Sequence, residues 1–182
     1  MSTATLIPTG TWSMDPAHSE VGFSVRHMGI AKVRGRFTSF EGTLVSGDSP
    51  EASHIEGTIQ AASIDTNEKD RDAHLRSDDF LKADANPEIT FRAEGLRPRG
   101  DDEFETEGEL TMAGVTRPVT LRGEVMGTET DPYGNERVGV ELRGALSRKE
   151  FGMTFNQMLG GGNMLVGDEV KIVIDASLIR QQ

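Results

Sequence analysis

Hydrophobic and polar residues alternate along most of this chain, as they do in strands that bury one face. From residue 20 onward one face carries apolar side chains, and a second alternating run starts after Met28-Gly29. The apolar parity of that run shifts between Phe37 and Phe40. A one-residue shift inside a strand predicts a β-bulge, which bends the strand. Residues 15–44 are therefore predicted to form two long, curved antiparallel strands with one apolar wall.

The same alternation marks the rest of the chain, and turn signals such as Asp15-Pro16 and Ala113-Gly114 separate the runs. The runs lie at residues 10–15, 52–64, 89–93, 104–112, 119–125, 138–146 and 170–178. About eight long strands with hairpin-length connections predict an all-β chain, and an up-and-down antiparallel barrel is its simplest closure. A two-sheet sandwich is the alternative. The length of 182 residues fits a single domain, residues 1–182.

The twofold period breaks once, and the break predicts one helical insertion near residues 67–82. Residues 67–76 are rich in helix formers, with Asn67 as the expected N-cap and acidic Glu68 and Asp70 in the first turn. A second short turn is expected at residues 77–81. The segment should lie across or beside one end of the barrel, with Leu75 and Phe80 packing inward.

The inward rows contain almost no titratable side chain, which is typical of a binding wall rather than a catalytic one. Gly57, Gly108, Gly123 and Gly144 interrupt these rows. Either they allow tight coiling at barrel corners, or their missing side chains leave a tunnel along the axis. The residues predicted to line this apolar tunnel are Val21, Phe23, Val25, Phe37, Phe40, Ile55, Gly57, Ile59, Phe91, Leu110, Leu121, Gly123, Val140, Leu142, Gly144, Phe155, Met158, Ile172 and Ile174.

Charge and composition narrow the class of partner. A net charge of -11 disfavours a nucleic-acid footprint and a long stay on an anionic membrane surface. The absence of cysteine excludes a disulfide framework and thiol chemistry. No run approaches the roughly 20 apolar residues of a membrane span. The first residues lack the features of a signal peptide, so a cytoplasmic location is expected.

Motifs for catalysis or metal binding are weak. The four histidines show no metal-ligand spacing, the acidic residues near position 70 do not fit a calcium loop, and residues 160–162 lack the lysine of a phosphate loop. No cofactor or metal is expected. Arg71, His74 and Arg76 could meet an anionic head group at a barrel mouth, or they could merely balance the local aspartates.

Residues 151–165 form an irregular segment with several methionines and three consecutive glycines. Methionine repacks readily and glycine permits movement, so the segment could be a mobile rim that selects ligands. The alternative is that its apolar side chains fill a gap in the core.

The motifs together resemble the YceI-like family across nearly the whole chain. The resemblance rests on Trp12, Asp15, His18, Ser19, Val21, Phe23, Val25, His27 and Met28, on Val33, Gly35, Phe37, Phe40 and Gly42, on Asp65, Thr66, Asn67, Asp70, Asp72, His74 and Leu75, on Asp79, Phe80, Leu81, Pro87, Ile89, Thr90 and Phe91, on Gly108, Leu110, Thr111, Gly114, Val115, Thr116, Pro118 and Val119, and on Phe151, Gly152 and Met153. It implies an extended lipocalin-like barrel whose interior takes an isoprenoid or another long lipid chain, often as a homodimer. Many members look secreted to a periplasm, and this sequence departs from them at its start.

The main hypothesis is a lipid-binding protein that carries or stores a polyisoprenoid, such as a prenyl diphosphate or a quinone tail. An enzyme acting on a barrel-bound lipid is a second hypothesis, which convergent titratable groups along the cavity would favour. A stress-related scaffold protein whose own side chains fill the barrel is a third.

Overall fold

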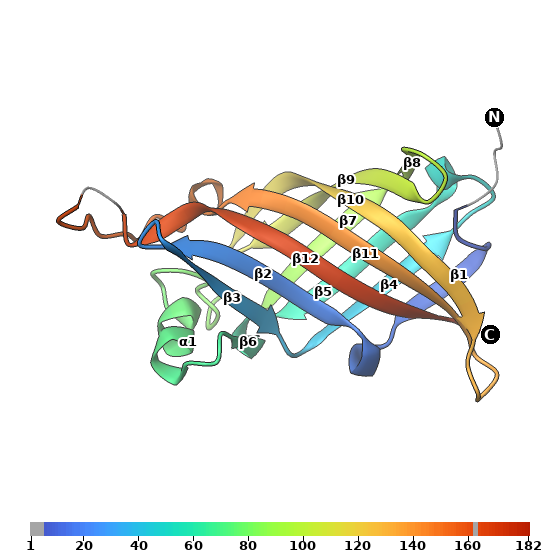
Figure 1. The fold of residues 1–182 in the computed structure, drawn as a ribbon, viewed down its shortest axis with the longest axis horizontal. Coiled ribbons are helices and arrows are strands. Elements are labelled where there is room, and N and C mark those ends of the chain that lie inside the picture. The colour runs from blue at the N-terminus through green and yellow to red at the C-terminus, as the bar shows by residue number, and fades with distance from the viewer. Residues whose placement is uncertain (1–5, 162–163) are drawn as a thin grey trace.

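Eight antiparallel strands close into an elongated β-barrel (Figure 1). The computed structural model describes residues 6–161 and 164–182. The strands are β1 (Gly10–Met14), β2 (Glu20–His27), β3 (Ala31–Phe37), β4 (Phe40–Ser46), β5 (His54–Gln60), β6 (Ile64–Asp65), β7 (Glu88–Glu94), β8 (Arg97–Pro98), β9 (Glu103–Met112), β10 (Val115–Thr130), β11 (Glu136–Ser147) and β12 (Val166–Arg180). The α-helix is α1 (Lys69–Arg76), and short 3-10 helices lie at Pro16–His18, Pro50–Ala52, Ala61–Ser63 and Arg148–Phe151.

The barrel closes in the order β1-β4-β5-β7-β9-β10-β11-β12, and β1 pairs back onto β12. The closing register places Trp12 opposite Arg180 and Met14 opposite Leu178. Because the first and last strands pair, the all-β barrel prediction is confirmed and the two-sheet sandwich is excluded.

Strand β12 is long enough to hold two partners in succession. Its first part pairs with β2, with Ile174 opposite Val21, and its last residues pair with β1. Strand β2 pairs in turn with β3, and β3 pairs over only two residues with β6. Helix α1 lies beside β3 and β6 at one end of the barrel (Figure 1).

The parity shift between Phe37 and Phe40 is a break between strands rather than a β-bulge, so that prediction was wrong. Residues 15–44 form three strands, not two: β2, β3 and β4. Thr38 and Ser39 form the bend where the chain leaves β3, and β4 then pairs with β1 and β5 instead. A parity change looks the same in sequence whether a strand bulges or ends, because in both cases an odd number of positions separates two inward residues, here three between Phe37 and Phe40.

The helix begins one residue later than an N-cap at Asn67 predicts, because Glu68 is the N-cap and Lys69 is the first helical residue. Asn67 has a left-handed φ of 66°, and the carboxylate of Glu68 accepts a hydrogen bond from the amide of Arg71. Behind the cap, the buried carboxylate of Asp72 accepts hydrogen bonds from the amide and the hydroxyl of Thr66. These bonds fix the helix to Thr66, the residue that directly follows β6.

The barrel is solidly packed at the end away from α1. Trp12, Phe104 and Val138 are each no more than 1% exposed there. The indole of Trp12 donates to the carbonyl of Pro8 at 2.9 Å, and the guanidinium of Arg180 lies 5.7 Å from its ring centroid. A large aromatic ring with its polar atom satisfied is a stable plug for the end of a barrel.

Candidate functional site

A cavity of about 590 Å³ occupies the barrel between this packed end and α1. Along β12 its wall runs from Val166 to Leu178, which is roughly 30 Å along the axis for a strand rise of about 3.3 Å and a tilt near 40°. The cavity is therefore long rather than compact. Most of the predicted tunnel residues lie on its wall: Val21, Phe23, Val25, Phe37, Phe40, Ile55, Gly57, Ile59, Phe91, Leu110, Leu121, Val140, Leu142, Phe155, Ile172 and Ile174.

The floor of the cavity lies at the same level on neighbouring strands. Met14, Val140 and Leu178 are the last residues on their rows to line it. The next inward residues on β1 and β11 are Trp12 and Val138, which are completely buried. Among the described residues the cavity is thus closed at the bottom by packed side chains, and its mouth lies at the end that carries α1.

Gly123 and Gly144 do not line the cavity, so for these two the tunnel prediction was wrong. A Cβ placed on Gly123 would lie 2.1 Å from the Phe104 ring, and one on Gly144 would lie 2.6 Å from Leu121 Cδ2. Gly108 is likewise covered, by the ring of Phe91 at 2.5 Å. These glycines leave room for a large side chain from the neighbouring strand, which packs flat against the bare backbone.

Gly57 is different, because it leaves open space. The nearest heavy atom to a Cβ there is the Glu41 carbonyl oxygen at 3.7 Å, and Gly57 lies opposite Gly42 in the register of β4 and β5. Both glycines line the cavity at mid-depth, between the Leu44–Ile55 pair near the floor and the Phe40–Ile59 pair above. Here the missing side chains do widen the cavity.

Titratable side chains line the mouth of the cavity, and they include two of the three predicted head-group residues. Arg71 and His74 line the mouth, whereas Arg76 does not. Arg71 is held by the Thr66 hydroxyl at 2.8 Å and the Thr66 carbonyl at 2.7 Å. His74 contacts Asp79 Oδ2 at 2.9 Å through Nε2 and packs edge-on against the rings of Phe80 and Phe155.

The residues expected to pack inward from the helical segment do so. Leu75 and Phe80 both line the cavity. Met158, by contrast, is 73% exposed and lies outside the cavity wall, which corrects its placement among the tunnel residues. It forms an isolated bridge with Met164 in the β11–β12 connection.

Arg148 is a residue of the mouth that sequence reasoning missed. It is 2% exposed, lines the cavity, and donates to the carbonyls of Gly167, Met153 and Val166. No carboxylate of the described residues lies within 4.0 Å of it. Burial lowers its pKa and the field of Asp168 opposes this. In sequence it precedes Lys149 and Glu150 and resembles a solvated charge run.

Asp168 holds the strand end behind Arg148 in place. Burial raises the pKa of this carboxyl, but hydrogen bonds from the Ser147 hydroxyl and the Lys149 amide outweigh it, and the net pKa is lowered. The carboxylate is therefore charged at neutral pH, and its field acts on the buried guanidinium of Arg148. One cation buried against backbone carbonyls at the entrance of an apolar cavity is suited to an anionic or strongly polar group.

The described ranges, 6–161 and 164–182, contain no cluster of three or more His, Asp or Glu side chains that could hold a metal ion. They also contain no helix that is long and apolar enough to cross a membrane.

A closed eight-stranded barrel with a long apolar cavity and one polar mouth is the architecture of lipocalin-like binding proteins. Residues 12–178 match the sequence model of the YceI-like domain. The chain is also 36% identical over 166 residues to proteins named Protein YceI from Salmonella arizonae and Salmonella paratyphi B, covering 91% of this chain and 83% of each relative. The chain belongs to the YceI-like family.

Solved structures agree on the fold. The YCEI protein of Campylobacter jejuni superposes with a TM-score of 0.73 at 28% identity, covering 93% of this chain and 97% of that one. BcnA of Burkholderia cenocepacia gives 0.78 at 20% identity, covering 90% and 98%. A polyisoprenoid binding domain from Saccharophagus degradans gives 0.71 at 13% identity, covering 93% and 98%, and this likeness concerns the fold alone.

Proposed function

We propose that this protein binds one long-chain isoprenoid or related lipid, such as a polyprenyl diphosphate or a quinone tail, as a carrier or storage protein. The observation that carries the proposal is the single-ended apolar cavity of about 590 Å³. An apolar cavity of about 150 Å³ accommodates benzene, or about 25 Å³ per carbon, so this one has room for a chain on the order of 20 carbons. Its length and closed floor favour an extended chain inserted tail first.

The mouth supplies the polar half of the proposed site. Arg71 and His74 on α1 face the cavity from one element, and Arg148 faces it from another. Glu68 and Asp70 also line the mouth, so the local charge is mixed, and a phosphate and a neutral quinone ring are both compatible with it. Burial of each methylene contributes about 0.8 kcal/mol before association costs are subtracted. Affinities in the nanomolar to micromolar range are expected.

Family membership supports binding rather than catalysis. The Saccharophagus domain with the same fold is described as polyisoprenoid binding. In this chain Glu41 and Glu56 line the cavity at mid-depth, but the alternation of β4 and β5 turns their side chains outward, where Glu56 pairs with Arg92. The other titratable residues of the wall lie at the mouth. The depth of the cavity holds hydrocarbon side chains, which position a lipid tail but transfer no proton to it. An enzyme acting on a bound lipid is the weaker proposal for that reason.

The test combines native mass spectrometry of the purified chain with displacement of a fluorescent polyene fatty acid. The decisive variant is Gly57→Phe, because a Cβ there meets nothing closer than the Glu41 carbonyl oxygen at 3.7 Å and the new ring would enter the cavity at mid-depth and shorten it. We expect affinity for chains longer than about 12 carbons to fall at least tenfold. Gly139→Phe is the matched control, since a Cβ there meets only Met126 Cβ at 3.5 Å on the outer face. Equal binding by both variants would refute the cavity as the site.

Two further features stay predictions. Homodimer formation, implied by the family resemblance, is tested by light scattering coupled to size-exclusion chromatography. A cytoplasmic location is tested by fractionating the source cells with antibodies against the chain.

A further inference from the structure

We infer that the mouth end of the barrel docks on an anionic lipid bilayer, through a surface formed by the β2–β3 hairpin and the β11–β12 connection. This docking surface consists of Arg26, Met28, Ile30, Lys32, Arg34, Met158 and Met164. The inference rests on the proposed lipid-binding function, because it assigns the membrane from which the bound lipid is taken or to which it is delivered.

Two segments far apart in sequence bring exposed apolar side chains to the same place. Ile30 is 77% exposed at the hairpin tip, and Met158 is 73% exposed in the connection. The amide of Met28 donates to the carbonyl of Leu165 at 2.9 Å, and Val166 pairs with His27, so the two segments are joined. Figure 1 shows both projecting at the end of the barrel that carries α1. Exposed apolar tips on adjoining loops mark an interaction surface.

The side chains beside these tips are positively charged, whereas the chain as a whole is negatively charged. The protein has 30 acidic residues, yet positions 21–40 contain none, and they hold Arg26, Lys32, Arg34 and Arg36. All four arginine and lysine side chains are exposed. Of these four side chains, only that of Arg36 forms an ion pair with a carboxylate of the described residues, that of Asp65 at 3.7 Å.

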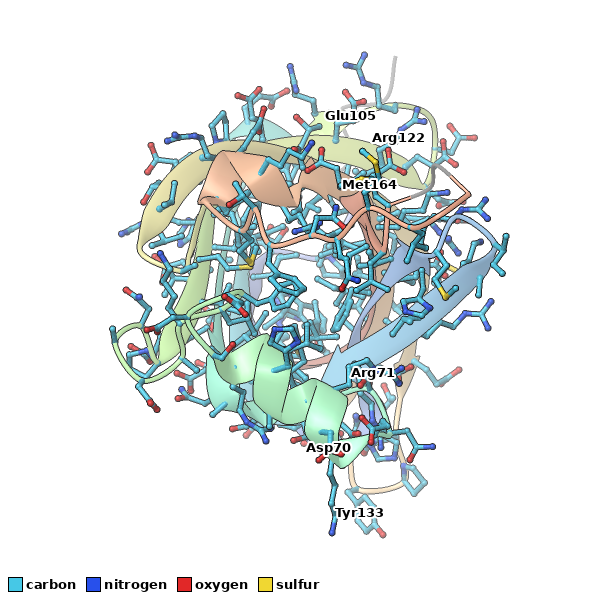
Figure 2. All side chains as sticks on the ribbon, turned by 90° about the vertical axis from the view of Figure 1, so that its left-hand side faces the viewer. Asp70, Arg71, Glu105, Arg122, Tyr133 and Met164 are labelled. Atoms are coloured by element: carbon cyan, nitrogen blue, oxygen red, sulfur yellow. The ribbon has the colours of Figure 1, made fainter. Side chains whose placement is uncertain are left out.

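Apolar tips bordered by cations match the chemistry of an anionic bilayer surface, in which apolar side chains enter the headgroup region while lysine and arginine meet the phosphates. The net charge of -11 does not prevent this contact. Screening confines electrostatic interactions to about 8 Å at physiological salt, so the charges nearest the bilayer decide. Acidic side chains on α1, such as Asp70, lie across the mouth from Met164 (Figure 2), which predicts that the barrel tilts toward the hairpin side.

The docking surface borders the mouth of the cavity. Arg26, His27 and Leu165 line the cavity as well as belonging to the hairpin and the connection. A bilayer bound here would face the opening through which a lipid tail must pass, and the tail could move between membrane and cavity with little exposure to water. A docking surface at the closed end would offer no such path.

Sedimentation with vesicles tests the inference, using phosphatidylcholine alone and phosphatidylcholine with 30% phosphatidylserine, at low and at physiological salt. The full chain should bind the anionic vesicles more tightly and lose affinity with salt. Replacing Arg26, Lys32 and Arg34 with Gln should weaken binding on the order of 100-fold, from about 1 kcal/mol per cation. Ile30→Ser with Met158→Ser should weaken it at least about tenfold.

Matched controls come from other faces of the barrel. The triple variant Arg97→Gln, Arg99→Gln, Arg122→Gln removes three exposed cations that surround Glu105, and Tyr133→Ser removes a side chain that is 89% exposed elsewhere. Both should bind vesicles like the parent. Vesicle binding that is absent, or that survives both sets of docking-surface substitutions, would overturn the inference. So would substitutions that only change the oligomeric mass, because the surface would then pair two copies.

The fatty-acid probe, used in vesicle-free buffer, separates this inference from the proposed function. If the protein takes up the probe but does not bind vesicles, docking alone is overturned. If the parent protein binds vesicles, the docking-surface variants do not, and the protein takes up no probe, docking is supported and the lipid cavity is refuted.

Discussion

The two halves of this barrel are built from the same strands, yet one is filled and the other is hollow. On β1 the inward row passes from Trp12, which is 1% exposed, to Met14, which lines the cavity. On β10 it passes from Gly123, covered by Phe104, to Leu121 on the cavity wall. The alternation that makes a strand is the same on both sides of this boundary. Only the size of the side chains that meet across the axis decides whether the space is core or cavity.

Glycine shows the difference most clearly. Gly123 accommodates a ring from the neighbouring strand, whereas Gly57 opposite Gly42 leaves space that no side chain of the described residues fills. A glycine on an inward row therefore indicates either tight packing or a cavity, and its cross-strand neighbour decides which.

Truncation of the plug should have the largest effect. Trp12→Ala removes a fully buried ring and should lower the free energy of unfolding by about 3–5 kcal/mol. Phe40→Ala removes a half-buried ring from the cavity wall, and we expect a loss of roughly 1–2 kcal/mol because less surface returns to water. Chemical denaturation of both variants measures the difference. Equal losses would mean that the cavity half is packed as tightly as the plug.

The same substitution at two glycines should give opposite results. Gly123→Leu forces the Phe104 ring out of its place and should cost about 1–3 kcal/mol of stability. Gly57→Leu meets open space, so stability should stay the same or rise by up to about 1 kcal/mol as the strand loses a flexible residue. Lipid affinity should fall in the second variant. A stable Gly123→Leu protein would contradict the role assigned to Phe104.

Acid should weaken the closed end through one arginine. Hydrogen bonds from His18 and Arg137 lower the pKa of Asp15, and hydrogen bonds from Arg137 and Asn135 hold the pKa of Asp131 well below its usual range. A lowered folded-state pKa contributes stability that is present above the unfolded value near 3.9 and is lost as pH falls through the folded value. Arg137→Gln should therefore lower stability at pH 7, with the deficit shrinking below about pH 4.

Urea unfolding between pH 7 and pH 2 measures that deficit. Asp101→Asn serves as the control, because Asp101 is exposed and pairs with no cation in the described residues. Its denaturation midpoints should follow the parent at every pH. A deficit for Arg137→Gln that stays constant down to pH 2 would show that the arginine acts by packing and not by charge.

The smallest expected effect is local, at the mouth. Phe155 lines the cavity and contacts His74 and Phe80, so a bound chain should order the β11–β12 connection around it. Amide hydrogen exchange in residues 152–161 should slow several-fold when the lipid is bound, while β9 and β10 hardly change. Equal protection with and without lipid would leave the connection as part of the core, the alternative that its composition also allows.

The all-β class and the one helical segment could be predicted from the sequence, because the periods of two and 3.6 residues are local properties of the chain. Motifs spread from Trp12 to Met153 also identified the YceI-like family. The bulge expected before Phe40 was wrong because a parity change does not show which partner the next strand takes. Tertiary structure alone decided that β4 pairs with β1.

The cavity likewise combines features that the sequence predicts with features that depend on tertiary contacts. Alternation placed apolar residues such as Phe23, Leu110 and Ile174 on the inner wall, but the tertiary structure decided that Phe104 fills the space of Gly123. It also decided that Arg148 is buried at the mouth, held by carbonyls from residues up to 19 positions away. Whether an inward position is core, cavity or mouth depends on what lies across the barrel, and that neighbour is distant in sequence.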